Sequence, residues 1–235
     1  MNIGKLIALI CCFLSIGLWA QEPSQAINDI DGNVYKTIKI GNQTWMQENL
    51  RATHYGNGDE IKTLKPDTLD LTDMVQPKYQ WAYKSKDSLV ADYGRLYTWF
   101  VVTDKRNICP SGWHVPTDNE FCILENFLEP GLDPDCNKVK HRGTNIGNLL
   151  KEAGHKHWGD PETGANNYSG FTGLPSGVRY FTGKFDFLTL YGSFWSATEF
   201  DSKKAWNRRL YHNEPDISRA YYFKKDSYSV RCIKD

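Results

Sequence analysis

Apolar and polar residues alternate with a period of two in several short stretches, which predicts a domain built mainly from short β-strands. The clearest stretch is Val34 to Ile40, and tight-turn dipeptides flank it at Asp31-Gly32 and Gly41-Asn42. Gln43 to Met46 returns after the second turn, so we expect a β-meander here. Asp29 to Asn33 also resembles a calcium loop, but it lacks the Gly and Glu spacing of an EF-hand, which favours the hairpin.

Further short apolar stretches predict strands in the second half of the chain. They are Val178 to Phe181, Phe194 to Thr198, Ala220 to Phe223 and Ser227 to Ile233. In the last of these, alternation places Tyr228, Val230 and Cys232 on one inward face. Residues 55–89 are polar and irregular, which predicts a long surface segment. The apolar run over residues 93–102 fits a strand or a helix equally well.

One helix is predicted clearly. Thr117 stands at the N-cap position and Glu120 follows three residues later, which is the pattern of a capping box. The apolar positions then recur with helical spacing at Phe121, Leu124, Phe127 and Leu128. Pro130-Gly131 ends the helix. A shorter helical piece is expected from Asn145 to Ala153.

The first 20 residues have the pattern of a secretory signal peptide. Lys5 precedes the apolar run from Leu6 to Leu18, and Ala20 supplies a small residue at the cleavage point. The run is shorter than the roughly 20 residues of a membrane-spanning helix, which disfavours an anchor. Lipoprotein processing at Cys11 or Cys12 is disfavoured because no small residue precedes either one. We therefore expect an exported protein with no membrane span after cleavage.

Residues 21–235 are expected to form a single domain, because no repeat or low-complexity linker divides them. The charges balance, with 28 Lys and Arg against 28 Asp and Glu, so nothing supports nucleic-acid binding. The 8 Trp, 13 Tyr and 11 Phe, together with many Gly and Asn, favour short strands and long ordered loops over a helix bundle.

Four cysteines lie beyond the predicted leader: Cys109, Cys122, Cys136 and Cys232. In an exported chain they predict two disulfides, and three pairings are formally possible. A zinc site is the alternative, but these cysteines show no Cys-x-x-Cys spacing.

Catalytic patterns are weak along the chain, and we expect no enzyme activity. Pro175-Ser176-Gly177 is a plain turn and not a nucleophile elbow. His155 and His157 lack a third metal ligand nearby, which favours a solvated loop. Asp118 and Glu120 are explained by helix capping alone.

The Gly- and Asn-rich segment from His155 to Gly177 is the candidate ligand-binding loop. Exposed aromatic rings pack against the apolar faces of sugars, and amides and carboxylates bind sugar hydroxyls. The candidate surface consists of Trp158, Asp160, Asn166, Asn167 and Tyr168. The alternative is that Trp158 fills the core beneath the loop while the Asn residues hold turns.

A series of ordered motifs resembles the Fibrobacter succinogenes major paralogous domain, a family of secreted proteins from Bacteroidota and related bacteria. The motifs span residues 29–35, 40–50, 93–97, 109–117, 170–175, 194–199 and 229–235. The resemblance implies a Cys109–Cys232 disulfide. The second disulfide is then Cys122–Cys136, which looks like an addition in this member.

This family in turn looks like a relative of the formylglycine-generating-enzyme and C-type-lectin-like fold group, through His114 to Phe121 and Val230-Arg231. That resemblance implies an α+β domain with small twisted antiparallel sheets, one or two helices and long irregular loops. The copper-binding cysteine pair of those enzymes has no counterpart that we can place here. Asn213 to Asp216 is similar to the Glu-Pro-Asn element of lectins, but the Trp-Asn-Asp segment that should follow is missing, so calcium has only weak support.

The expected function is therefore that of an exported, non-catalytic module that recognises an extracellular glycan or protein at the cell surface, without a cofactor. The alternatives are a diverged enzyme of the formylglycine-generating type and a structural surface scaffold.

Overall fold

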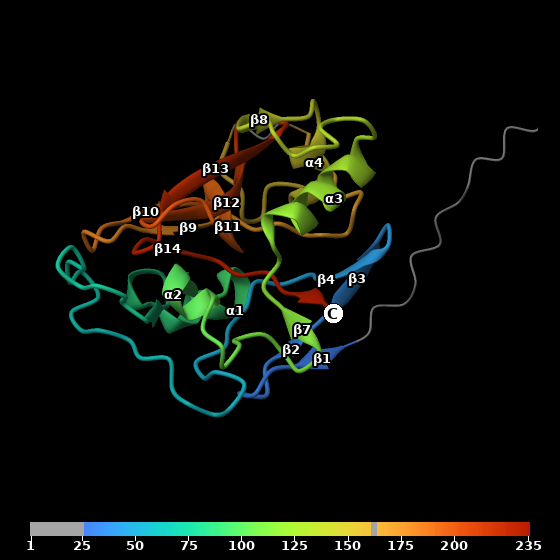
Figure 1. Ribbon diagram of the computed structural model, residues 1–235. Helices are drawn as coiled ribbons and strands as arrows, with labels where there is room; N and C mark the ends of the chain where they lie inside the picture. Colours follow the sequence, from blue (N-terminus) through green and yellow to red (C-terminus); the bar gives the residue numbers. More distant parts are fainter. Residues whose placement is uncertain (1–25, 161–163) are drawn as a thin grey trace, which may run out of the picture.

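Short antiparallel strands make up most of the regular structure in the computed structural model, which describes residues 26–160 and 164–235 (Figure 1). Few helices accompany them, and long loops join the elements. The structure therefore confirms an α+β domain of small antiparallel sheets. The predicted signal peptide, residues 1–20, lies outside the described residues. No helix in the described ranges is both long and apolar enough to cross a membrane.

The predicted meander is present at the start of the domain. A two-stranded ribbon joins β1 (Ile27–Asn28) to β2 (Val34–Tyr35), and a four-stranded sheet has the order β3 (Thr37–Ile40), β4 (Gln43–Met46), β15 (Ile233–Lys234) and β7 (Trp113–His114). Asp29 holds the first turn, because its carboxylate accepts from the backbone N–H groups of Asp31 and Asn33 at 3.0 and 2.9 Å. This bracing confirms the hairpin at Asp31-Gly32.

Two further sheets form the rest of the fold. One has the order β10 (Phe185–Leu188), β9 (Ser176–Arg179), β14 (Ser227–Tyr228), β6 (Leu96–Thr98) and β5 (Gln80–Trp81). The other has the order β11 (Tyr191–Glu199), β12 (Lys204–Tyr211), β13 (Ile217–Phe223) and β8 (Lys140–Arg142). The sequence patterns predicted parts of β9, β11, β13, β14 and β15, but they missed β5, β7, β8, β10 and β12.

The main helix, α3 (Asp118–Leu128), has the predicted capping box: Thr117 Oγ1 accepts from the Glu120 N–H, and the Glu120 carboxylate accepts from the Thr117 N–H at 2.7 Å. The ambiguous run near residue 100 divides into α1 (Val90–Tyr93), β6 and α2 (Trp99–Val102). Two 3₁₀ turns, η1 (Tyr83–Ser85) and η2 (Asp87–Leu89), precede α1. The predicted helix after Asn145 is shorter than expected: α4 (Ile146–Leu150) ends where Lys151 becomes extended.

The last residues of the chain connect all three of the larger sheets. Tyr228 pairs with Tyr97 of β6, Ser229 forms a bridge to Phe194 of β11, and Ile233 pairs with Trp45 of β4. In Figure 1 this red segment runs between the strands β9 to β13 and the helices α1 and α2. The C-terminal strand is therefore a central part of the fold.

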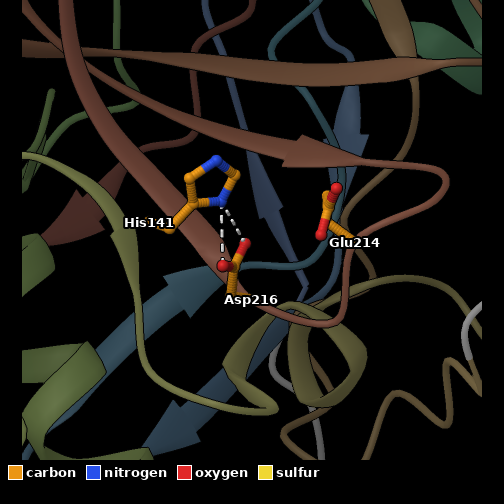
Figure 2. Close-up of side chains that lie close together, drawn as sticks. All are labelled: His141, Glu214 and Asp216. Atoms are coloured by element: carbon orange, nitrogen blue, oxygen red, sulfur yellow. Dashed lines mark hydrogen bonds and ion pairs between the residues drawn. The ribbon is translucent and has the colours of Figure 1, made fainter.

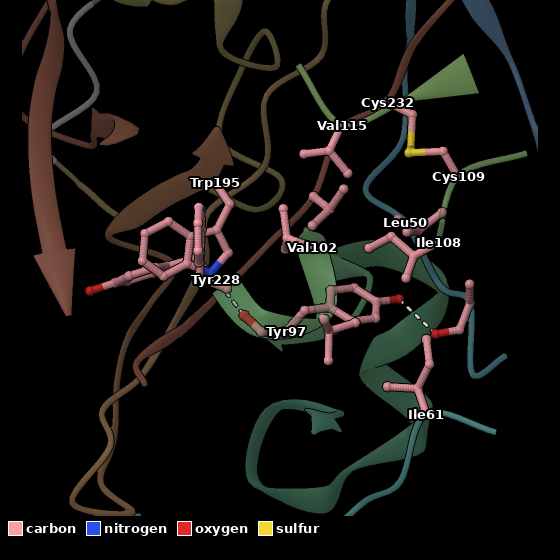
Figure 3. Close-up of a cluster of buried hydrophobic side chains, with 14 of the residues drawn as sticks. Leu50, Ile61, Tyr97, Val102, Ile108, Cys109, Val115, Trp195, Tyr228 and Cys232 are labelled. Atoms are coloured by element: carbon pink, nitrogen blue, oxygen red, sulfur yellow. Dashed lines mark hydrogen bonds between the residues drawn. A yellow bond between two sulfur atoms is a disulfide. The ribbon is translucent and has the colours of Figure 1, made fainter. Parts of the chain in front are cut away.

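Figure 3 shows the core around this segment. Trp195 and Tyr228 are fully buried and their rings lie edge to face, 4.7 Å between centroids. Trp195 Nε1 donates to the Tyr97 carbonyl at 2.9 Å, and the Tyr97 hydroxyl donates to the Ala52 carbonyl at 2.8 Å. Tyr228, Val230 and Cys232 belong to one core cluster, as alternation predicted, but Ser229 and Arg231 between them are equally buried, so this segment is covered on both faces.

Both expected disulfides are present, Cys109–Cys232 and Cys122–Cys136, with Cα–Cα distances of 6.0 and 5.9 Å. The first borders the core cluster in Figure 3 and joins the segment before β7 to the segment before β15. The second attaches the loop after α3 to the helix itself.

The surface segment predicted over residues 55–89 is partly wrong. Tyr55, Ile61, Leu71 and Trp81 are almost completely buried. Their spacing follows no regular period because turns and backbone contacts, rather than a helix or long strand, direct them inward. The Trp81 ring, for example, lies 3.9 Å from the guanidinium of Arg179.

Candidate functional site

The predicted ligand-binding loop does not form one aromatic surface. Trp158 is only 4% exposed and belongs to the same core cluster as Leu150 and Phe171. Its indole N–H donates to the Gly173 carbonyl at 3.1 Å. The proposal of Trp158 as a surface ligand residue is therefore corrected, because a ring packed in the core offers no face to a sugar. Tyr168, by contrast, is 72% exposed.

The two Asn residues of that loop hold turns, as the alternative interpretation stated. Asn167 Oδ1 accepts from the Thr172 N–H at 2.8 Å, and Asn166 Oδ1 accepts from the Tyr168 N–H at 3.0 Å. Asp160 is exposed and its nearest ionic partner is His155, at 3.3 Å. The structure thus places Asn166 beside Tyr168 but does not gather all five candidate residues.

The two histidines of the loop have different surroundings and different ionic partners. His157 is largely buried and its Nδ1 lies 2.8 Å from the Glu152 carboxylate, whereas His155 pairs with Asp160. Among the described residues, neither histidine belongs to a group with three metal-ligating side chains.

A different surface has the features of a binding site. Three adjoining hollows, of about 670, 390 and 410 Å³, surround the segment from Val75 to Lys78 and the side chain of Phe100. They adjoin because Phe100, Ser202 and Lys224 line the first two, while Gln76 and Lys78 line the first and the third. We call this surface the basic groove. Its cationic lining residues are Lys62, Lys78, Lys105, Arg106, Lys203, Lys224 and Lys225.

Two backbone hydrogen bonds position the walls of the basic groove. Helix α2 supplies Phe100, and its first N–H, that of Trp99, donates to the Lys224 carbonyl at 3.0 Å. The Lys224 N–H in turn donates to the Lys203 carbonyl at 2.9 Å. These bonds join α2 to the β11–β12 turn and the β13–β14 turn. Lys224 is therefore 4% exposed, although its ammonium reaches the groove.

The carboxylates of the basic groove are Asp104 and Glu199, and both are paired. Asp104 accepts from Arg106 and from Lys78, each at 2.7 Å, and these cations hold the pKa of its carboxyl well below the usual range. Glu199 lies 2.6 Å from the Lys224 ammonium. Over the described chain, no carboxylate lies within ion-pair distance of Lys62, Lys105 or Lys203. The groove therefore has an excess of positive charge on a protein whose total charge is balanced.

Apolar groups line the second hollow beside these cations. Phe181 and Phe223 meet edge to face at 5.4 Å, and Phe223 is 43% exposed. Val75 is 85% exposed, and Phe100 is partly buried. The basic groove thus combines exposed apolar surface with unpaired ammonium groups, and this combination suits a ligand that carries both apolar faces and negative charge.

Sequence reasoning missed the basic groove because its residues are spread from Lys62 to Lys225. The sequence shows only three separate basic pairs there, Lys105-Arg106, Lys203-Lys204 and Lys224-Lys225, and the balanced total charge conceals that they meet on one surface. The only other sequence signal was the high aromatic content.

A second group of polar side chains lies at the opposite end of β13. His141 of β8 faces Asp216, just before β13, with Nδ1 at 2.9 Å from Oδ2, and Glu214 lies next to them (Figure 2). One ligand atom from each of these three side chains lies within 4.8 Å of the others. Glu214 and Asp216 belong to the lectin-like motif over Asn213 to Asp216, whereas no sequence signal connects His141 to them.

The comparison with protein-family models gave a match to the family described as Fibrobacter succinogenes major domain, over residues 38–234. No curated protein and no solved structure matches the chain.

Proposed function

The chain belongs to the Fibrobacter succinogenes major domain family, and we propose that this member is an exported, non-catalytic module that binds an acidic glycan in the basic groove. The observation that carries the proposal is the charge of the groove. The seven cationic side chains named above line the groove, and only two carboxylates, those of Asp104 and Glu199, line it with them. A cleft lined mainly by one sign of charge attracts a ligand of the opposite sign.

The apolar lining favours a glycan among anionic ligands. Phe223 and Phe100 offer surface for the C–H faces of sugar rings, while Lys105 and Lys203 supply free ammonium groups for carboxylate or sulfate substituents. Neutral glycans would gain only the apolar contacts and should bind less tightly.

Export and the absence of catalysis are part of the same proposal. Disulfides form and persist in oxidising compartments, and the described chain contains two. The four cysteines are all paired, so none of them is a free thiol of the kind that a formylglycine-generating-type enzyme would need. We also retain the relationship to the C-type-lectin-like fold group as a proposal, supported by the small antiparallel sheets and long loops.

The proposal is tested by titrating the mature protein with uronate-containing or sulfated oligosaccharides and with neutral oligosaccharides of equal length. The acidic series should bind more tightly than the neutral series, and its affinity should fall as the salt concentration rises. The double variant K105E/K203E should bind at least about tenfold more weakly, because two attractive charges become repulsive.

The matched control is K36E/K39E, which makes the same charge change at exposed positions outside the groove. Acidic-glycan binding should persist in this control. Equal loss in both double variants would show that only total charge matters, and binding that is unaffected by K105E/K203E would exclude the groove.

A further inference from the structure

The group of His141, Glu214 and Asp216 has the composition of a transition-metal site. It offers one imidazole nitrogen and two carboxylates, which are the ligand types that Zn²⁺ takes from His, Asp and Glu. Zinc bonds to nitrogen and oxygen are about 2.0–2.2 Å long, so two ligands of one tetrahedral ion stand about 3.4 Å apart. The three side chains therefore need only small rotations to share an ion.

Hydrogen bonds and close packing fix the backbone of the turn that carries Glu214 and Asp216. The Lys151 ammonium donates to the carbonyls of Tyr211 and Glu214 at 3.1 and 3.0 Å. The Asn148 N–H donates to the Pro215 carbonyl at 3.1 Å. Gly147 of α4 lies so close that a Cβ there would stand 2.0 Å from the Asp216 carbonyl oxygen. The turn that carries both carboxylates is thus packed against α4.

The histidine is positioned by a different element. His141 pairs with Ser218 across β8 and β13, one register position from Ile217, which is buried. Its ring lies over that of Tyr211, 6.2 Å between centroids. In Figure 2 the Asp216 carboxylate points at the imidazole and Glu214 stands beside them. The side chains of His141 and Asp216 are 57% and 14% exposed, so solvent reaches the group.

We propose that His141, Glu214 and Asp216 bind a divalent first-row transition metal, with Zn²⁺ as the probe, and that the remaining coordination position faces solvent. The imidazole favours zinc over calcium and magnesium, which prefer ligand sets made only of oxygen. The bound ion joins the edge strand β8 to the β12–β13 turn. The site lies about 25 Å from the basic groove, at the other end of β13, so the two proposals are independent.

The experiment is a calorimetric zinc titration of the mature, untagged protein after chelator treatment. We expect one zinc ion per chain. The variants H141Q, E214Q and D216N should each weaken zinc binding by at least about tenfold, since each removes one of three ligands. Cobalt substitution gives a second readout, because loss of the imidazole ligand changes the visible absorption of bound Co²⁺.

The control variant is H155Q/D160N. It removes another exposed His–Asp pair, 3.3 Å apart, that has no third ligand among the described side chains. Zinc binding should be unchanged in this control, and acidic-glycan binding should be unchanged in D216N. Absence of zinc binding by the unmodified protein would overturn the proposal. It would also be overturned if H141Q, E214Q and D216N each bound zinc as tightly as the unmodified protein does.

Discussion

Buried charged residues distinguish this protein at the scale of single side chains. Arg231 has zero exposure, and its guanidinium donates to the carbonyls of Met46, Phe171 and Thr172 and to Asn49 Oδ1. Burial lowers its pKa to about 9. Met46 ends strand β4, whereas Asn49, Phe171 and Thr172 lie in loops, so the guanidinium ties these loops to the end of that strand and satisfies acceptors that would otherwise be buried without a partner. Its role is therefore structural.

Asp226 is the buried carboxyl with the clearest consequence for pH dependence. It is 3% exposed, and burial raises its pKa to about 6. Hydrogen bonds from the Phe181 N–H at 2.9 Å and the Tyr228 hydroxyl at 3.2 Å act in the opposite direction and lower the pKa, but burial has the larger effect. The folded protein thus holds this proton more tightly than the unfolded chain. The stability that protonation contributes is complete below pH 3.8 and is lost as the pH rises through about 6.

We predict that the free energy of unfolding of the wild type, relative to D226N, falls by up to about 3 kcal/mol between pH 4 and pH 7.5. The amide does not titrate, so the subtraction removes the contribution of other groups. Urea denaturation at a series of pH values measures this difference. D201N provides the comparison, because Asp201 is exposed and backbone hydrogen bonds lower its pKa. The free energy of unfolding of the wild type relative to D201N should therefore not fall as the pH rises.

At the scale of elements, α3 is attached to the sheet by a buried ionic network. Glu125 of α3 is fully buried and accepts from Arg142 of β8 at 2.6 Å and from Arg208 of β12. Asp118, at the start of α3, accepts from Arg208 at 2.5 Å and from Arg219 of β13 at 2.7 Å. The charged face of the helix, and not only its apolar stripe, therefore determines how α3 packs on the sheet.

We predict that E125Q lowers the free energy of unfolding by about 3–5 kcal/mol, because it leaves two buried guanidinium groups with one fewer negative charge. E129Q, which changes a partly exposed carboxylate just after the same helix, should have an effect below about 1 kcal/mol. Chemical denaturation of both variants checks the prediction. Similar losses in the two variants would show that burial of the network is not what stabilises α3.

The distance between interacting residues explains which elements could be predicted from the sequence. The capping box of α3 depends on Thr117 and Glu120, three residues apart, so it is visible in the sequence. Strand β12 was missed because Asn207, Arg208 and Arg209 are buried polar residues in the middle of it. Alternation of apolar and polar residues is absent when charged side chains face the interior, since only their partners from other elements make that burial favourable.

At the scale of the whole molecule, the C-terminal segment and the Cys109–Cys232 disulfide unite the three larger sheets. The disulfide spans a sequence separation of 123 residues, and Cys122–Cys136 spans 14. In the chain-entropy treatment, a disulfide stabilises by restricting the unfolded chain, and longer loops gain more.

We therefore predict that C109S/C232S lowers the free energy of unfolding by about 5 kcal/mol and that C122S/C136S lowers it by about 3 kcal/mol. Thermal and chemical denaturation of the two double variants, under identical conditions, provides the comparison. A melting temperature unchanged by C109S/C232S would contradict the structural role that we assign to this disulfide.

Local features of this protein were determined by its sequence. The meander turns, the capping box of α3 and the direction of Tyr228, Val230 and Cys232 follow from the conformations of neighbouring residues or from side chains a few positions apart. Tertiary structure alone decided the burial of Trp158, the basic groove and the group of His141, Glu214 and Asp216. Lys78 and Lys203 lie on one surface, and His141 lies next to Asp216, only because strands distant in sequence pair in a particular register. The conformational preferences of neighbouring residues do not determine that register.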